Sequence, residues 1–487
     1  MPNIFPNGLK GLSDSLYSGI EGSVAKMVGV DIHSSPGLIK VHQALAKDSP
    51  DSPGVNEVTE LCRVRLAVSS GETFWFSYTS GKIWRRSTAG AWLLVYTTAA
   101  TGTDGCLGAA EYDGFIYWAT AESLNRIPIA NIATKQNWID HAAAGINWAT
   151  FINKDAEFHP MVVRGLRLFI GDGNYVSKVW DDDGTHTFVA KALDIKTPLR
   201  IKTMIEFDID LLIGTFVSDY VNKAEIIRWD TYDEESWQTD DTIEENGINA
   251  FIKDDNYVYA QCGKYGRIYF YDGVRLIPYK RIPGDWSPTK YGEVYPQAVS
   301  TLLTIPVFGF SNGLGNPTEQ GVYSFGSYSK DYPKVLDLSY PVSAGLEGIE
   351  IGAVLAVGAD LLVSWYDGTN YGVDALNWSA KYASAYIETM VLTAAEIRHF
   401  LKTAIEFFAN YVSLPVSTAI EFKYKKKHES AFSAAVTVID DIKLMQIRTK
   451  EGTIPEVAAL QMRIDFTVSV NNAPEVESFG YKDNTEE

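Results

Sequence analysis

The stretch Asp113-Gly114-Phe115-Ile116-Tyr117-Trp118 decides the fold, because it places a hairpin turn directly before an aromatic run. Asp-Gly pairs favour the tight turns of β-hairpins, and aromatic and β-branched residues favour strands. Stretches of the same type recur along the chain: Gly165-Leu166-Arg167-Leu168-Phe169-Ile170, Asp210-Leu211-Leu212-Ile213-Gly214, Asn256-Tyr257-Val258-Tyr259-Ala260 and Asp360-Leu361-Leu362-Val363-Ser364. The sequence therefore repeats one β unit.

The repeat has a spacing of 41 to 55 residues, measured between the centres of these strands at Trp75, Ile116, Leu168, Leu212, Val258, Val307 and Leu362. A second strand follows within each of the first six units, at 82–85, 124–127, 178–180, 226–229, 267–270 and 322–325. Further hairpin turns are expected at Asp272-Gly273, at Asp367-Gly368 and in the run 181–184. Units of this length built from short strands are typical of propeller blades. We predict an all-β fold with an about seven-bladed β-propeller over 58–377.

The segments on either side of the repeat differ from it. Residues 1–57 form an N-terminal arm, in which 38–42 could be an early strand that closes the ring by pairing with the last blade. Residues 378–487 contain long alternating strands, at 385–389, 403–408, 419–424, 445–448 and 460–468. Period-2 alternation indicates antiparallel strands with one buried face, so we predict a C-terminal β-sandwich. The polar tail 481–487 is expected to be frayed or docked on a neighbour.

Composition limits the classes of function. The chain has 487 residues, with 42 Lys and Arg against 61 Asp and Glu, and a formal charge of −19 that disfavours direct DNA binding. Cys62, Cys106 and Cys262 form no CxxC pair and are expected to be buried small hydrophobes. The first ten residues lack the layout of a secretory signal, and no long apolar window is present. We expect synthesis in the cytosol and no membrane span.

Candidate catalytic and metal motifs are few. The seven histidines lack the close spacing of a metal site, and 309–313 matches G-x-S-x-G without a following helix, so it is interpreted as a glycine-rich blade loop. The run 181–185 could offer oxygens to calcium, but a solvated hairpin is the simpler interpretation. The acidic stretch 230–245 could supply glycosidase carboxylates, yet a run within one loop is normally a charged surface. We predict no enzyme, no catalytic residue, no cofactor and no metal.

Two groups of residues are candidates for an interaction surface. Lys423, Lys425 and Lys427 lie on one face of an alternating strand, where they could contact phosphate or an acidic neighbour. An exposed strand face leading into a hairpin is the plainer interpretation. Trp237 and Trp286 are expected in loops, where exposed aromatics could bind sugars or anchor an interface. The sequence does not choose between these roles.

The order of parts resembles β-propeller tail proteins of tailed bacteriophages. Within the C-terminal region, 386–389 with 398–407, the central strand 420–424 and the closing strands 460–466 with 474–476 are similar to the family's pattern. The usual glycine-rich turn after the central strand is replaced by 425–429.

The resemblance implies a virion structural protein made in the host cytoplasm. It would be a tail hub, nozzle or minor tail protein that acts in tail assembly, and in host attachment or DNA delivery. Other tail or head-tail proteins and further copies in a ring-symmetric homo-oligomer would be its partners. The alternative from another class is a carbohydrate-binding or glycosidase propeller, with a host surface glycan as partner. A WD-type scaffold is weaker, because Trp229-Asp230 stands outside any repeating Gly-His frame.

Overall fold

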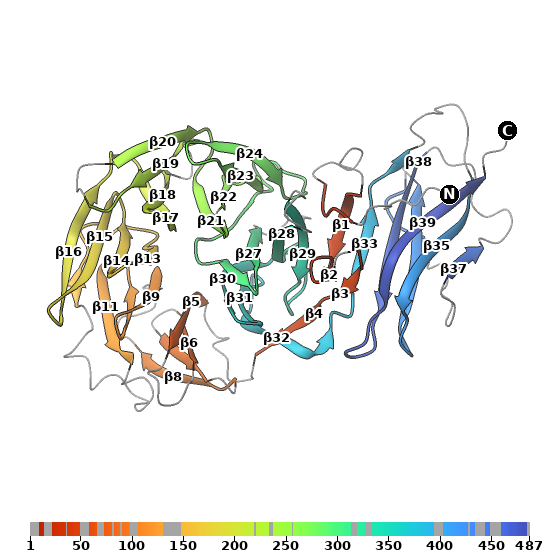
Figure 1. The fold of residues 1–487 in the computed structure, drawn as a ribbon, viewed down its shortest axis with the longest axis horizontal. Coiled ribbons are helices and arrows are strands. Elements are labelled where there is room, and N and C mark those ends of the chain that lie inside the picture. Colours follow the sequence, from red (N-terminus) through yellow and green to blue (C-terminus); the bar gives the residue numbers. More distant parts are fainter. Residues whose placement is uncertain are drawn as a thin grey trace.

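The fold was obtained as a computed structural model, in which all described elements are β strands (Figure 1). The structure describes residues 9–13, 22–35, 37–48, 58–65, 73–79, 82–87, 90–97, 106–129, 148–218, 221–232, 237–255, 257–312, 319–327, 334–393, 403–426, 429–433, 444–448 and 459–484. Within this part of the chain, no helix has the length and apolar character needed to cross a membrane.

Five antiparallel sheets follow one another along the chain, and each consists of four consecutive strands. The first two are β5 (Val58–Arg65), β6 (Thr73–Thr79), β7 (Lys82–Arg86) and β8 (Trp92–Thr97), then β9 (Gly108–Tyr112), β10 (Phe115–Ala119), β11 (Ser123–Pro128) and β12 (Ala149–Thr150). The third is β13 (Met161–Arg164), β14 (Arg167–Asp172), β15 (Tyr175–Asp182) and β16 (Thr185–Asp194). The fourth and fifth are β17 (Arg200–Phe207), β18 (Asp210–Phe216), β19 (Ala224–Trp229) and β20 (Trp237–Ile243), then β21 (Ile248–Asp254), β22 (Tyr257–Cys262), β23 (Arg267–Tyr271) and β24 (Leu276–Arg281). Figure 1 shows them arranged around a ring, which is the arrangement of a β-propeller.

The ring continues through two further groups of strands. The first group is β25 (Gly292–Glu293), β26 (Val299–Leu302), β27 (Ile305–Asn312), β28 (Gly321–Ser327) and β29 (Lys334–Tyr340). The second is β30 (Glu350–Val357), β31 (Asp360–Tyr366) and β32 (Tyr371–Lys381). The innermost strands contact one another in the order β5, β9, β13, β17, β21, β26 and β30, and β30 contacts β5. The described strands therefore form a closed ring.

The repeat found in the sequence corresponds to the second and third strands of each sheet. Ile116, Leu168, Leu212, Val258, Val307 and Leu362 are at most 1% exposed, so these centres form the packing between sheets. The predicted turns are also confirmed. Asp113 and Gly114 have φ of 44° and 76°, and Asp183 and Gly184 have φ of 52° and 82°. Positive φ at both central residues is the type I′ geometry that matches the twist of a hairpin.

The N-terminal strands close the ring, but not with the predicted residues. They are β1 (Val24–Val28), β2 (Val30–Asp31), β3 (Lys40–Val41) and β4 (Gln43–Lys47). β4 pairs with β32, with Leu45 opposite Leu376, whereas 40–41 pair with β2. The expected segment 38–42 is therefore displaced by five residues. Where the ring meets itself, the Ser364 hydroxyl donates to the Val58 carbonyl at 2.9 Å.

The C-terminal strands form two sheets. β33 (Tyr386–Thr389), β34 (Leu392–Thr393), β36 (Ala419–Lys426) and β38 (Ala459–Thr467) belong to one, and β35 (Thr403–Ser413), β37 (Leu444–Arg448) and β39 (Glu475–Asn484) to the other. The five strands predicted here are present. The tail prediction is wrong for its first part, because β39 runs to Asn484 and pairs with β35; residues 485–487 lie outside the described residues.

β1 joins the C-terminal strands to the ring. It pairs in parallel with β29, where Val28 is opposite Leu338, and antiparallel with β33, where Met27 is opposite Ile387. One continuous sheet therefore passes from the ring through β1 into β33 and β38 (Figure 1). The buried side chains on both sides of this joint belong to a single core.

Truncation of Leu45 tests ring closure. Leu45 is 6% exposed on β4, and replacing a buried leucine by alanine removes packing and leaves a cavity. We expect Leu45→Ala to lower the free energy of unfolding by about 2–3 kcal/mol in chemical denaturation. Leu166→Ala, at an 86% exposed leucine in the turn between β13 and β14, is the matched control and is expected to change it by less than about 0.5 kcal/mol. Equal effects of the two variants would contradict the closing role of β4.

A buried histidine predicts how stability depends on pH. His159 is fully buried and stacked on Phe151 at 4.1 Å, its Nδ1 lies 2.6 Å from the Gly171 carbonyl oxygen, and burial lowers its pKa to about 4. Folding favours the neutral ring, so its contribution is complete above pH 6.5 and is lost as the pH falls toward 4, by about 3 kcal/mol. We expect His159→Gln to reduce this loss in denaturation curves between pH 7 and 4. An unchanged slope would contradict the assignment.

Candidate functional site

The joint between ring and C-terminal sheets carries a row of charged side chains across four strands. In register, Lys26 of β1 lies opposite Glu388 of β33, Glu388 opposite Arg463 of β38, and Arg463 opposite Lys423 of β36. Opposite charges directly across two strands stabilise the pair, whereas the like-charged pair of Arg463 and Lys423 needs an acidic partner. We call these four residues the junction row.

Acidic partners balance the cations of the junction row. Arg463 Nη1 lies 3.2 Å from Glu388 Oε1, and its Nη2 lies 2.8 Å from Asp465 Oδ1. Lys423 Nζ lies 2.8 Å from Asp465 Oδ2, and Lys26 pairs with Glu319 at the edge of the ring. The row is therefore neutralised from within the chain.

A tyrosine connects the junction row to the ring. The Tyr386 hydroxyl donates to Glu319 Oε1 at 3.0 Å, and the Arg463 guanidinium lies 3.8 Å from the centre of the Tyr386 ring. Burial raises the pKa of Glu388, against the lowering effect of Lys26 and Arg463. Glu388 is only 6% exposed, so its carboxylate depends on these two cations.

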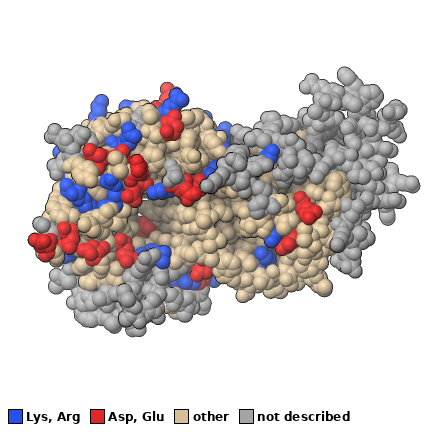
Figure 2. Space-filling model, viewed as in Figure 1, with Lys and Arg blue, Asp and Glu red and all other residues tan. Residues whose placement is uncertain are grey.

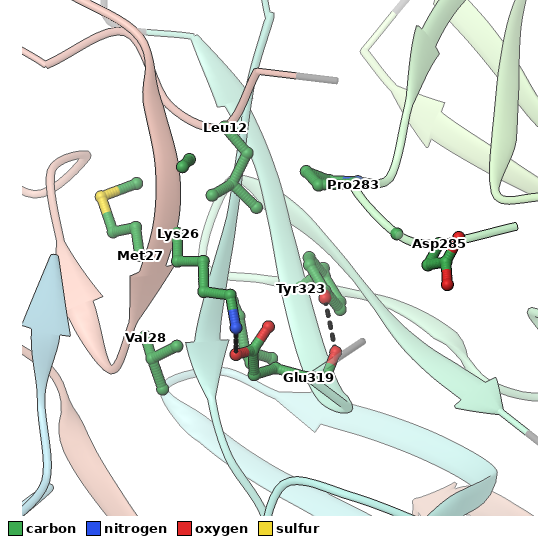
Figure 3. A pocket seen from close by; sticks show the side chains of 11 residues that line it. Leu12, Lys26, Met27, Val28, Pro283, Asp285, Glu319 and Tyr323 are labelled. Atoms are coloured by element: carbon green, nitrogen blue, oxygen red, sulfur yellow. Dashed lines mark hydrogen bonds and ion pairs between the residues drawn. The ribbon is translucent and has the colours of Figure 1, made fainter. Parts of the chain in front are cut away.

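A cleft lies beside the junction row (Figure 3). It has a volume of about 260 Å³ and lies between β1, β28 and the loop 283–285. Leu12, Met27 and Val28 give it an apolar wall, while Lys26 points across it toward Glu319 (Figure 3). The Tyr323 hydroxyl donates to the backbone carbonyl of Glu319 at 2.7 Å.

A second cavity lies where the innermost strands converge. Its volume is about 190 Å³, and it is lined by Thr59, Cys106, Leu107, Glu157, Phe158, Tyr295, Gln297 and Gly352. These residues come from several sheets, as expected for the middle of a propeller. Glu157 is the only carboxylate among the lining residues, whereas glycoside cleavage uses a pair. Figure 2 shows the visible face of the ring hollowed near its middle, with acidic and basic residues interspersed around it.

The predicted basic surface is only partly as expected. Lys423 and Lys425 lie on one face of β36, but Lys423 is paired with Asp465 and the Lys425 ammonium lies 4.6 Å from the centre of the Phe432 ring. Lys427 lies outside the described residues. Two of the three lysines are thus engaged within the chain.

The predicted exposed tryptophans are half-buried, which corrects the expectation. Trp237 is on strand β20, opposite Trp229, and packs against the core of the fourth sheet. Trp286 is in a loop, but its Nε1 donates to the Ile282 carbonyl at 3.0 Å, and its ring meets Phe310 edge-on at 5.7 Å. Both rings are therefore partly packed within the chain.

Other predicted motifs have structural roles. Ser311 of the G-x-S-x-G match lies in β27 rather than in a loop, and its hydroxyl donates to the Ile351 carbonyl at 3.1 Å. Glu245 of the acidic stretch is 4% exposed and accepts hydrogen bonds from Arg267 and Tyr269, so this position is not surface. The three cysteines are buried and free, as predicted.

Lys26, Glu388 and Arg463 were not among the residues predicted from the sequence. The only available signal was a charged residue on the polar side of each alternating strand, which is also what a solvent-facing strand shows. The position of Lys26 depends on β1 lying between β29 and β33, a contact between distant parts of the chain.

Comparison with known proteins gives structural similarity only. No protein-family model and no curated protein sequence matches the chain. The extracellular domain of a putative hybrid two-component system from B. thetaiotaomicron is similar with a TM-score of 0.44 and 11% identity, over 71% of this chain and 41% of that one. This chain thus covers less than half of that domain.

Two smaller propellers are similar over nearly their whole length. The WD40 propeller domain of Doa1 has a TM-score of 0.41 and 10% identity, over 69% of this chain and 98% of that one. Virginiamycin B lyase from Staphylococcus aureus has a TM-score of 0.42 and 11% identity, over 68% of this chain and 99% of that one. At these identities and TM-scores the similarities carry no information about function.

Removing one cation of the junction row tests its role. Arg463→Met would leave Glu388 buried with one partner fewer, and we expect the free energy of unfolding to fall by about 3 kcal/mol at pH 7. Adding Glu388→Gln should restore part of this loss, because the unpaired charge is then gone. Chemical denaturation of the wild type, both single variants and the double variant gives the coupling free energy between Arg463 and Glu388. A coupling near zero would show that the two side chains act independently.

Proposed function

We propose that the chain is a structural component of a phage tail, a hub, nozzle or minor tail protein that acts through its surfaces. The observation that supports this most is the continuous sheet through β1. Domains joined by a linker normally move relative to each other, whereas the pairing of β1 with both β29 and β33 and a shared core resist such motion. A rigid body with two parts suits a building block of an assembly.

We further infer seven blades and a C-terminal sandwich. The group β26–β29 would be the sixth blade, and β30–β32 with β4 the seventh. The closed contacts of the innermost strands support this count. For the sandwich, Ile420, Phe422, Met462 and Ile464 from one sheet share a core with Ala409, Val476 and Phe479 from the other.

Assembly would be homo-oligomeric with ring symmetry, since closed symmetric contacts are the usual solution for repeated building blocks. Tail or head-tail proteins would dock on the two faces of the ring, where the loops between strands lie. Delivery of DNA or attachment to a host would then be a property of the assembled tail.

Labelling of virions tests this proposal. We expect gold-labelled antibodies against the purified chain to mark the tails of the phage that encodes it, and the purified chain to form a discrete ring in light scattering and negative-stain micrographs. Antibodies pre-adsorbed with the chain are the control. A monomer at high concentration, together with unlabelled tails, would overturn the proposal.

A further inference from the structure

Three ligand atoms meet where the second and third sheets of the ring face each other. Asp113 lies in the turn between β9 and β10, and Asp181 and His186 lie on either side of the turn between β15 and β16. One ligand atom from each of the three side chains lies within 4.8 Å of the others. His186 Nε2 is 2.8 Å from Asp113 Oδ2. The two sheets thus place a nitrogen and two carboxylates around one point.

The other ring nitrogen of His186, Nδ1, has a hydrogen-bond partner within the protein. It is hydrogen-bonded to the Tyr117 hydroxyl, and Tyr117 is fully buried. Arg126 Nη1 donates to the same hydroxyl at 3.4 Å, and Phe115 packs edge-on against the imidazole at 4.9 Å. The ring therefore cannot turn away, and Nε2 stays directed at the carboxylates. Histidines that bind metals are usually oriented by such a hydrogen bond at the other nitrogen.

Access and charge both suit a cation at this point. The His186 side chain is only 5% exposed, while Asp113 is 51% exposed, so an ion would approach from the carboxylate side. Asp181 is exposed as well. Two carboxylates with a neutral imidazole balance the charge of a divalent ion. The Arg126 guanidinium does not compete, because it stacks over Trp148 at 4.1 Å behind Tyr117.

We propose that Asp113, Asp181 and His186 bind a divalent transition-metal ion, with Zn²⁺ as the best fit, and that this ion connects the second sheet to the third. Zinc accepts imidazole nitrogen and carboxylate oxygen together, with water in a fourth position. Calcium and magnesium prefer oxygen alone. Nε2 binds the ion through its lone pair, so the proton of the neutral imidazole lies on Nδ1 and is donated to the Tyr117 hydroxyl oxygen.

Calorimetry on the full chain tests the site. The chain is stripped with EDTA, dialysed and titrated with ZnCl₂ in millimolar MgCl₂, which occupies diffuse acidic surface. We expect one Zn²⁺ site in the wild type, no detectable site in His186→Ala and clearly weaker binding in Asp181→Asn. Tyr117→Phe should weaken binding about tenfold, because it removes the hydrogen bond that orients His186.

Asp183→Asn is the matched control, because Asp183 is an exposed carboxylate in the same hairpin but outside the ligand set. It should bind Zn²⁺ like the wild type. Binding that survives His186→Ala, or that Asp183→Asn weakens as much as Asp181→Asn, would overturn the proposal.

Cobalt gives a readout that does not depend on the stability of the variants. Co²⁺ bound by the wild type should show the visible absorption of a four- or five-coordinate ion, and Zn²⁺ should displace it. A spectrum of hexahydrated Co²⁺ would exclude the site even if His186→Ala failed to fold.

Discussion

The backbone groups at sheet edges are the constraint on which the rest of the structure depends. An edge strand leaves a row of N–H and C=O groups unpaired, and a propeller joined to a second pair of sheets has several such edges. Residues 24–47 cover three of them, because β4 pairs with β32 while β1 pairs with β29 and β33. The same short segment therefore closes the ring and fixes the C-terminal sheets to it. Neither part is complete without it.

Electrostatics at the joint follow from this backbone arrangement. Glu388 and Arg463 face each other only because β33 and β38 are in register, and Lys26 reaches them only because β1 is the next strand. Buried ion pairs add little stability over apolar packing, but a wrong partner leaves a buried charge and is costly. The main effect of the junction row is therefore on the specificity of strand pairing. It disfavours any other register between the N-terminal strand and the C-terminal sheet.

Local features of the fold could be predicted, and distant pairings could not. Asp113-Gly114 and Asp183-Gly184 specify hairpins through the conformations of two residues, so their sequence was sufficient. The closing strand was displaced from 38–42 to 43–47, because both segments alternate and the choice depends on partners such as Asp374, opposite Lys47. Residues 481–484 were predicted as a tail for a similar reason. This polar end of β39 is a strand because it pairs with β35. Asp113 and His186 are 73 residues apart, which no spacing motif detects.

Basic side chains that form ion pairs within the chain leave an acidic surface for contacts with other proteins. Several basic side chains are engaged internally: Lys26 with Glu319, Lys202 with Glu293, Arg267 with Glu245, and Arg463 and Lys423 with Asp465. The net charge of −19 then falls largely on the exposed surface. In the proposed assembly, like charges on neighbouring copies would repel, so contacts between copies would have to be apolar or bridged by cations. Neighbouring proteins with basic surfaces would be attracted to the remaining acidic surface, which favours docking of a different protein on the homo-oligomeric ring.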